Sequence, residues 1–146
     1  MVEAYVDDLL RALIAESGIG ETAFGGALLA ETRDGFHNSW KNRYGWLDRG
    51  FGISITGSKE RQEFDVMVEL RNALAHGDGS LSARQRANLL SMVTLESKLE
   101  TTLCVQARGG GLRLTSDSAT AAILICRRFV LCLDRATCSA RPGLNY

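Results

Sequence analysis

Histidine, paired cysteines and net charge are scarce in this sequence, and each scarcity excludes a class of function. Two of the 146 residues are histidine, none of the four cysteines lies in a C-x-x-C pair, and the formal net charge is zero. Without a C-x-x-C pair, and with its two histidines far apart in the sequence, the chain lacks the ligand spacing of a zinc site, so no metal site is expected. A neutral chain has no overall field that attracts a polyanion, so a nucleic-acid surface must be a local patch.

Segments for targeting or membrane insertion are also missing. Glu3, Asp7 and Asp8 stand where a secretory signal peptide carries a basic start followed by an apolar run. No apolar stretch approaches the ~20 residues of a membrane-spanning helix. We therefore expect a cytoplasmic protein without membrane contact, whose cysteines are reduced and serve mainly in packing.

The residues that are present suit one folded domain. Hydrophobic residues make up 45% of the chain, and its 146 residues are enough to bury a core. Arginine outnumbers lysine 14 to 3, which reflects either phosphate recognition by the guanidinium group or a GC-rich genome. We expect a single domain over residues 1–138 and a flexible tail over residues 139–146.

Periodic apolar residues predict about five helices. The expected helices cover residues 2–17, 24–51 (one long helix, or two broken near Gly35), 59–76, 82–99 and 119–137. Ser58 is expected to cap the helix that ends before Gly77, and Ser82 with Gln85 forms a capping box.

A β-hairpin is predicted between the last two helices. A run of glycines at positions 109–111 is a turn signal. It lies between two short segments that mix apolar and polar residues, Leu103–Gln106 and Leu112–Thr115. The predicted fold class is therefore mainly all-α, a helical bundle with a small β-hairpin before the last helix.

The most informative stretch is Arg71-Asn72-Ala73-Leu74-Ala75-His76-Gly77, at the end of the helix expected over residues 59–76. At about 100° per residue, Asn72 and His76 share a polar arc of about 60° with Asp65 and Glu69. Arg71 lies roughly 140° around the helix from His76. The predicted core arc consists of Val66, Met67, Leu70, Ala73 and Leu74.

These side chains suit cleavage of RNA. RNA supplies its own nucleophile, the 2′-hydroxyl, so a site needs an acid or base near neutrality and a cation for the phosphate. Histidine serves as acid or base, arginine grips the phosphate through two hydrogen bonds, and asparagine orients the substrate. Each chain offers one such histidine, so a paired acid and base suggest that two chains meet at this face.

The Arg71-Asn72-x-x-x-His76 pattern closely resembles the signature of the HEPN superfamily (higher eukaryotes and prokaryotes nucleotide-binding). The surrounding sequence resembles its RiboL-PSP-HEPN and MAE-type branch. The similar segments are the opening helix with Glu3–Leu10, the tryptophan-containing helix that ends at Arg49–Ile53, and the hairpin with Leu112–Leu114 before a closing helix. The resemblance covers most of the chain, and its specific part is the Arg-Asn-x-x-x-His core.

The resemblance implies a HEPN-like bundle that forms a homodimer, in which two motifs face each other and cleave single-stranded RNA without a metal or other cofactor. It implies that Arg71 and His76 are the catalytic pair and that Asn72 supports them. Such domains serve in toxin–antitoxin, phage-defence and RNA-repair systems, which implies an antitoxin or another partner protein. Asp78 stands where some relatives carry a tyrosine that a partner nucleotidyltransferase modifies, which argues against that regulation.

Further residues are weaker candidates. Asp65 and Glu69 either support His76 or are ordinary solvated acids. Lys41 and Arg43, in a run with His37, Trp40 and Tyr44, either contact RNA or belong to a core stripe with a solvated back. Arg127 and Arg128 either contact RNA or form a plain surface pair.

Two other functions compete with the ribonuclease. One is a non-catalytic module that binds RNA, a nucleotide or a partner protein. The other is a structural, dimeric subunit of a defence assembly. The non-catalytic module predicts binding without cleavage and a dimer face that need not bring the two His76 side chains together.

Overall fold

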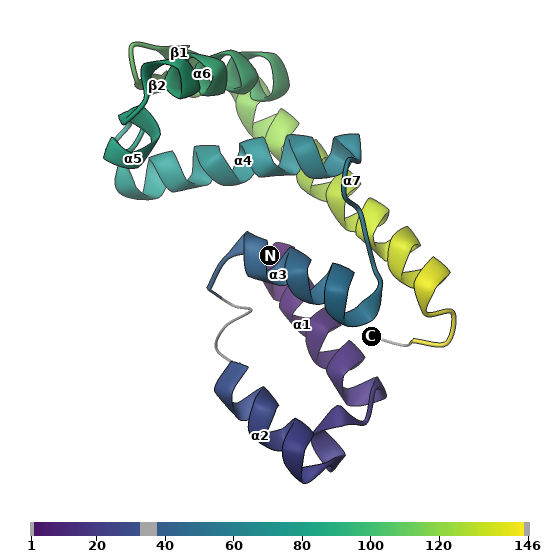
Figure 1. Ribbon diagram of the computed structural model, residues 1–146. Helices are drawn as coiled ribbons and strands as arrows, with labels where there is room; N and C mark the ends of the chain where they lie inside the picture. The colour runs from purple at the N-terminus through teal and green to yellow at the C-terminus, as the bar shows by residue number, and fades with distance from the viewer. Residues whose placement is uncertain (1, 33–37, 145–146) are drawn as a thin grey trace. The chain divides into compact units, whose positions relative to one another are not determined.

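The computed structural model describes residues 2–32 and 38–144, and helices dominate it (Figure 1). Over these residues the elements are α1 (Val2–Glu16), α2 (Ala23–Thr32), α3 (Trp40–Gly45), α4 (Lys59–His76), α5 (Ala83–Arg86), α6 (Leu89–Leu103), β1 (Gln106–Arg108), β2 (Gly111–Arg113) and α7 (Ser116–Ala140). A 3-10 turn (Ile19–Glu21) follows α1, and a π-helical turn (Trp46–Gly50) continues α3. The mainly all-α fold with a hairpin before the last helix is confirmed.

The chain divides into two compact units. Unit 1 comprises Met1–Thr56 and Val130–Tyr146, and unit 2 comprises Gly57–Phe129. Helix α7 belongs to both, because the boundary falls between Phe129 and Val130. The helix continues to Ala140, into the segment that the sequence predicts as a tail. The single domain over residues 1–138 stays a prediction.

In unit 1, α1 buries the apolar face that its periodicity predicts. Val6, Leu9, Leu10 and Leu13 are buried, and the left-handed Gly18 follows the end of the helix. Residues 24–51 contain two helices, α2 and α3, which is one of the two predicted arrangements. The predicted break at Gly35 lies outside the described residues.

Both tryptophans also lie in unit 1. The ring of Trp40 at the start of α3 lies 5.7 Å from that of Tyr44, centroid to centroid. The ring centroids of Trp46 and Phe51 are 6.5 Å apart. Gly52 then adopts a φ of +70°, and the backbone N–H of Ile53 returns to the carbonyl of Leu47 at 2.8 Å. The predicted end of the helix at Gly50 and Gly52 is therefore confirmed.

In unit 2, α4 is capped as predicted. The Ser58 hydroxyl accepts a hydrogen bond from the Arg61 N–H at 3.2 Å. The core side of α4 carries Phe64, whose ring stacks on Phe129 of α7 at a centroid distance of 3.9 Å. Within the predicted core arc, Val66, Leu70 and Ala73 are buried.

Leu74 is a correction to the predicted core. Its side chain is 43% exposed, although it shares the helical arc of the buried Leu70 and Ala73. Leu74 lies in the last turn of α4. Periodicity gives the direction of a side chain but not whether a neighbouring element extends far enough to cover it.

The helix predicted over residues 82–99 is two helices. The capping box is present: the Ser82 hydroxyl accepts a hydrogen bond from the Gln85 N–H, and the Gln85 side chain accepts one from the Ser82 N–H. However, α5 ends at Arg86. The Asn88 side chain then accepts a hydrogen bond from the Ser91 N–H at 2.9 Å and caps α6. An asparagine side chain that caps a new helix competes with continuation of the old one.

The hairpin is where the glycines predict it. Strands β1 and β2 are antiparallel, with Gln106 opposite Arg113 and Arg108 opposite Gly111. Gly109 and Gly110 form the turn with positive φ values of 58° and 86°.

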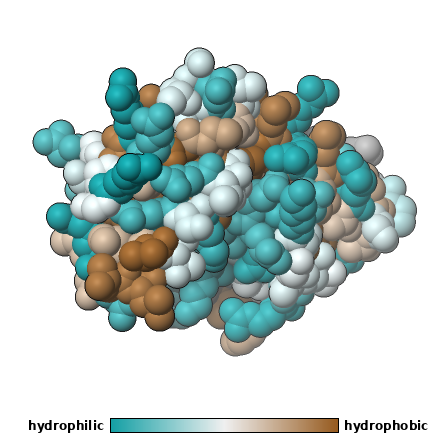
Figure 2. All heavy atoms as spheres, turned by 90° about the horizontal axis from the view of Figure 1, so that it is seen from above, coloured by the Kyte–Doolittle hydropathy of each residue, from teal (hydrophilic) through white to brown (hydrophobic). Residues whose placement is uncertain are grey.

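The surface contains apolar side chains among polar ones (Figure 2). Leu89 and Leu90 in the first turn of α6 are 71% and 77% exposed, so this turn adds little to the core of unit 2. Over residues 2–32 and 38–144, no helix combines the length and apolar character needed to cross a bilayer.

Candidate functional site

The three residues of the motif lie at the C-terminal end of α4. Arg71 and His76 are exposed and Asn72 is half-buried. The Arg71 guanidinium donates a hydrogen bond from Nη1 to the Asn72 side-chain oxygen at 3.3 Å. The neighbouring arginine and asparagine therefore contact each other directly, and His76 ends the same helix.

A tight turn follows His76. The Gly77 N–H donates to the carbonyl of Ala73 at 2.7 Å, and the Gly77 carbonyl accepts from the Ser80 N–H at 2.9 Å. Asp78 and Gly79 both have positive φ values, 47° and 80°. A Cβ atom on Gly77 would lie 1.8 Å from the Ser80 carbonyl oxygen, so this close approach requires glycine.

The turn is fixed to the β-hairpin. The Leu81 N–H donates to the carbonyl of Gly110 at 2.7 Å, and the Leu112 N–H donates to the carbonyl of Gly79 at 3.0 Å. Between these bonds, Ser80 and Gly111 form an antiparallel bridge. The residues after His76 thus pair with the outer edge of β2, and the hairpin lies beside the motif end of α4 (Figure 1).

Glu69 holds α5 against α4. Its carboxylate and its backbone carbonyl accept hydrogen bonds from the Gln85 amide at 2.6 and 3.0 Å. Arg84 of α5 lies 3.7 Å from the same carboxylate. These contacts give Glu69 a role in joining the two helices, and its support of His76 stays a prediction.

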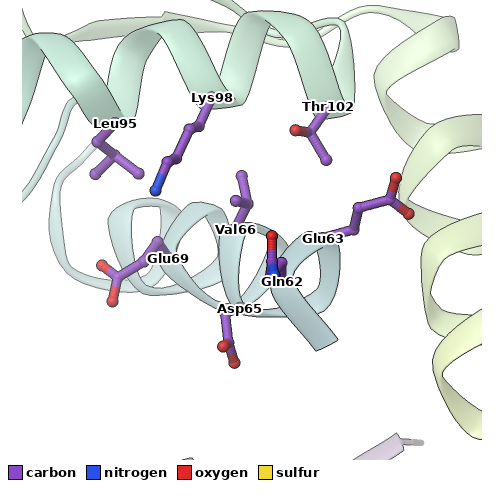
Figure 3. A pocket seen from close by; sticks show the side chains of 8 residues that line it. All are labelled: Gln62, Glu63, Asp65, Val66, Glu69, Leu95, Lys98 and Thr102. Atoms are coloured by element: carbon purple, nitrogen blue, oxygen red, sulfur yellow. The ribbon is translucent and has the colours of Figure 1, made fainter. Parts of the chain in front are cut away.

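Asp65 and Glu69 border a groove between α4 and α6 with a volume of about 470 Å³. Asp65 also lies 3.8 Å from Arg61, one turn earlier. In Figure 3, Lys98 extends from α6 toward α4, whereas Asp65 points away from α6. The motif residues do not line this groove. Of the predicted polar arc, Asp65 and Glu69 therefore line the groove, whereas Asn72 and His76 lie at the end of the helix.

Arg43 requires a correction. It is 5% exposed, and its guanidinium binds both carboxylate oxygens of Asp7 in unit 1. Its Cζ also lies 5.2 Å from the centroid of the Trp40 ring. A buried, paired guanidinium holds α3 to α1, so Arg43 is not an exposed RNA contact. His37 of the same run lies outside the described residues.

The other predicted RNA contacts, Lys41, Arg127 and Arg128, are exposed residues. Lys41 is exposed in unit 1, whereas Arg127 and Arg128 are in unit 2. Arg127 is exposed, and Arg128 pairs with Glu63 of α4 at 2.9 Å. The charge of Arg128 is thus partly neutralised by Glu63.

Three arginines near the motif were not predicted from the sequence. Arg108 and Arg113 are exposed on the hairpin, and Arg86 is exposed at the end of α5. The glycine run between Arg108 and Arg113 predicts the hairpin, but it does not predict that the hairpin pairs with the turn after His76.

The remaining ionisable groups do not suggest another site. Over the described residues, no three histidine, cysteine, aspartate or glutamate side chains are arranged to hold a metal ion. All four cysteines are free thiols. Burial raises the pKa of the Cys126 thiol, which favours the protonated, unreactive form.

The arrangement at the end of α4 offers an exposed imidazole and a guanidinium with an amide beside it. Such a set can exchange a proton and bind a phosphate. No family model, curated protein or solved structure matches this chain. The assignment of a function therefore depends on the residues of the chain itself.

Proposed function

We propose that this protein is a HEPN-type, metal-independent endoribonuclease that cleaves single-stranded RNA at a site shared by two copies of the chain. The observation that carries the proposal is the placement of Arg71, Asn72 and His76 at one exposed helix end, with Arg71 hydrogen-bonded to Asn72. These three residues also make up the specific core of the HEPN motif.

The reaction follows from the chemistry of these groups. His76 of one chain removes the proton of the 2′-hydroxyl, and the 2′-oxygen attacks the adjacent phosphorus. The bond from phosphorus to the 5′-oxygen breaks, and that oxygen takes a proton from His76 of the second chain. The products are a 2′,3′-cyclic phosphate and a 5′-hydroxyl end. Arg71 binds the non-bridging phosphate oxygens as negative charge develops, and Asn72 positions the substrate.

The dimer supplies the second acid–base group. The chain has two histidines, and only His76 stands in the motif. A base and an acid that act in the same step on opposite sides of the phosphorus are two separate proton-exchanging groups, and the motif of each chain offers one histidine for this role. Two copies that bring their α4 ends together provide them.

The test is RNA cutting in EDTA. Purified protein is incubated with end-labelled single-stranded RNA, and the product ends are identified by mass spectrometry. Wild type is expected to leave cyclic phosphates, and His76→Ala is expected to lose at least about 100-fold in rate. The matched control is His37→Ala, which removes the other histidine and should retain cutting.

Circular dichroism checks that both variants keep their helices. Cutting by a folded His76→Ala variant at the wild-type rate would disprove the assignment. Loss of activity on addition of EDTA would disprove the metal-independent mechanism.

The second candidate is a non-catalytic RNA-binding module. The exposed arginines of α5 and the hairpin favour it, because guanidinium groups bind a phosphate backbone without any acid or base. It predicts RNA binding without cut ends, in wild type and His76→Ala alike.

A cytoplasmic toxin or phage-defence effector, restrained by an antitoxin or another partner protein, is the physiological role that we propose. It predicts that expression of wild type arrests cell growth and that His76→Ala does not. A growth comparison of the two strains, with protein levels matched, measures this directly.

A further inference from the structure

We propose that Arg86, Arg108 and Arg113 form an RNA-binding surface, here called the hairpin arginine surface, that receives the backbone of single-stranded RNA beside His76. The inference rests on the proposed function for the identity of its ligand. It adds a binding surface outside the Arg-Asn-x-x-x-His motif.

The two hairpin arginines share one face. Gln106 and Arg108 are exposed on β1, and Ala107 between them is buried. Residues directly opposite each other in an antiparallel pair project to the same side of the sheet. Because Arg113 is opposite Gln106, it projects to the same solvent side as Arg108.

Arg86 of α5 lies against the turn of the same hairpin. Its Cδ atom lies 3.0 Å from the position that a Cβ atom on Gly110 would occupy. The aliphatic part of the Arg86 side chain therefore packs against the hairpin turn, while Arg86 as a whole is exposed to solvent. Three guanidinium groups, from α5, β1 and β2, thus lie on or against one small hairpin.

The same hairpin is paired with the turn after His76. The bridge between Ser80 and Gly111 places residues 79–81, β2 and β1 side by side. Strand spacing then puts β1 about 10 Å from this turn, which is within reach of neighbouring nucleotides of one strand. RNA bound on the arginines is thus delivered to the end of α4.

Two acids near this surface, Glu96 and Glu69, accept hydrogen bonds. The Glu96 carboxylate accepts a hydrogen bond from the backbone N–H of Gly110 at 2.6 Å. The Glu69 carboxylate is held by Gln85 and lies near Arg84. Asp78, in the turn itself, is the acid closest in sequence to His76. The three exposed arginines give this neutral chain a local group of positive charges, as backbone binding requires.

The experiment measures binding apart from cleavage. All proteins carry His76→Ala, so that the RNA stays intact, and bind a fluorescent oligouridine of about 12 nucleotides. The test variant adds Arg86→Gln, Arg108→Gln and Arg113→Gln. The matched control adds Arg11→Gln, Arg135→Gln and Arg141→Gln, three exposed arginines assigned to unit 1. Both sets remove three positive charges, so their total charge is equal.

Anisotropy titrations at several salt concentrations give the affinity and its salt dependence. Each phosphate contact contributes about 0.7 to the slope of log K against log salt for a single strand. The test variant is expected to bind at least about tenfold more weakly, with a slope smaller by about 2, and the control to bind like the parent. Arg-to-Lys substitutions at the same three positions keep the charge and should restore most of the affinity.

An equal loss of RNA affinity in the test and control variants would overturn the inference, because binding would then depend on the total charge and not on these three arginines. Absence of RNA binding by the parent would overturn it as well. If the test variant loses its helical circular dichroism, the measurement is repeated with the single variant Arg113→Gln. The slope of log K against log salt is then expected to change by about 0.7. An unchanged slope would contradict the inference. Failure of the proposed cleavage would appear separately, as uncut RNA with the wild-type histidine.

Discussion

The guanidinium of Arg43 and the carboxylate of Asp7 form a buried, two-contact ion pair that joins α3 to α1. The distances are 2.8 Å from Nε to Oδ1 and 3.1 Å from Nη2 to Oδ2. Both side chains are largely buried, so neither partner could be fully solvated if the other were removed. The pair therefore restricts which substitutions unit 1 tolerates.

Asp7→Asn is expected to lower the free energy of unfolding by about 3 kcal/mol, because it leaves the buried guanidinium without a counter-charge. Asp8→Asn is the matched control. Asp8 is 71% exposed and pairs with Arg11 at the surface, so its loss should cost less than about 1 kcal/mol. Urea titrations followed by tryptophan fluorescence compare the two. Equal losses would contradict the structural role of the pair, and the double change Asp7→Leu with Arg43→Met should recover much of the stability.

Gly77→Ala is expected to destabilise the protein by about 1 to 3 kcal/mol, as overpacking does elsewhere, because its Cβ atom would collide with the Ser80 carbonyl. The displaced turn should also slow RNA cutting, since Gly77 directly follows His76. Gly143→Ala serves as the control, because a Cβ atom there meets no neighbour within 4 Å. Thermal unfolding and cutting rates measure both effects, and an unchanged midpoint for Gly77→Ala would show that the turn differs from the one described.

Cys126 is expected to react with iodoacetamide more slowly than the exposed Cys104 and Cys138. The thiolate is the reactive form, and burial raises the pKa of Cys126, so its rate curve should lie at higher pH. Peptide mass spectrometry after brief labelling at several pH values gives the rate for each cysteine. In urea, where burial is lost, the three curves should coincide. A Cys126 curve that already matches the others in the native protein would contradict this burial.

The features that the sequence predicts correctly are local ones. The caps by Ser58 and by Ser82 with Gln85 each involve residues three positions apart, and the glycine turn lies within a few residues. Asn88 is a similar local signal for a helix cap, but no glycine or proline beside it marks the end of the preceding helix.

The features that the sequence does not predict depend on distant partners. Arg43 is buried because Asp7, 36 residues away, neutralises it. Leu74 is exposed although it continues a buried stripe. For the candidate site, the helical wheel predicts the face of Asn72 and His76, whereas the pairing of Ser80 with Gly111 links residues that no local pattern connects. The hairpin arginine surface follows from that pairing and from the position of Arg86.

The location of Trp40 and Trp46 gives the two units different optical properties. Residues 57–129, which form unit 2, contain neither tryptophan nor tyrosine. Intrinsic fluorescence excited at the red edge therefore arises from unit 1 alone, whereas far-ultraviolet circular dichroism follows the helices of both units. The unfolding of unit 2, which carries the motif, therefore changes the circular dichroism, whereas the tryptophan fluorescence reports on unit 1.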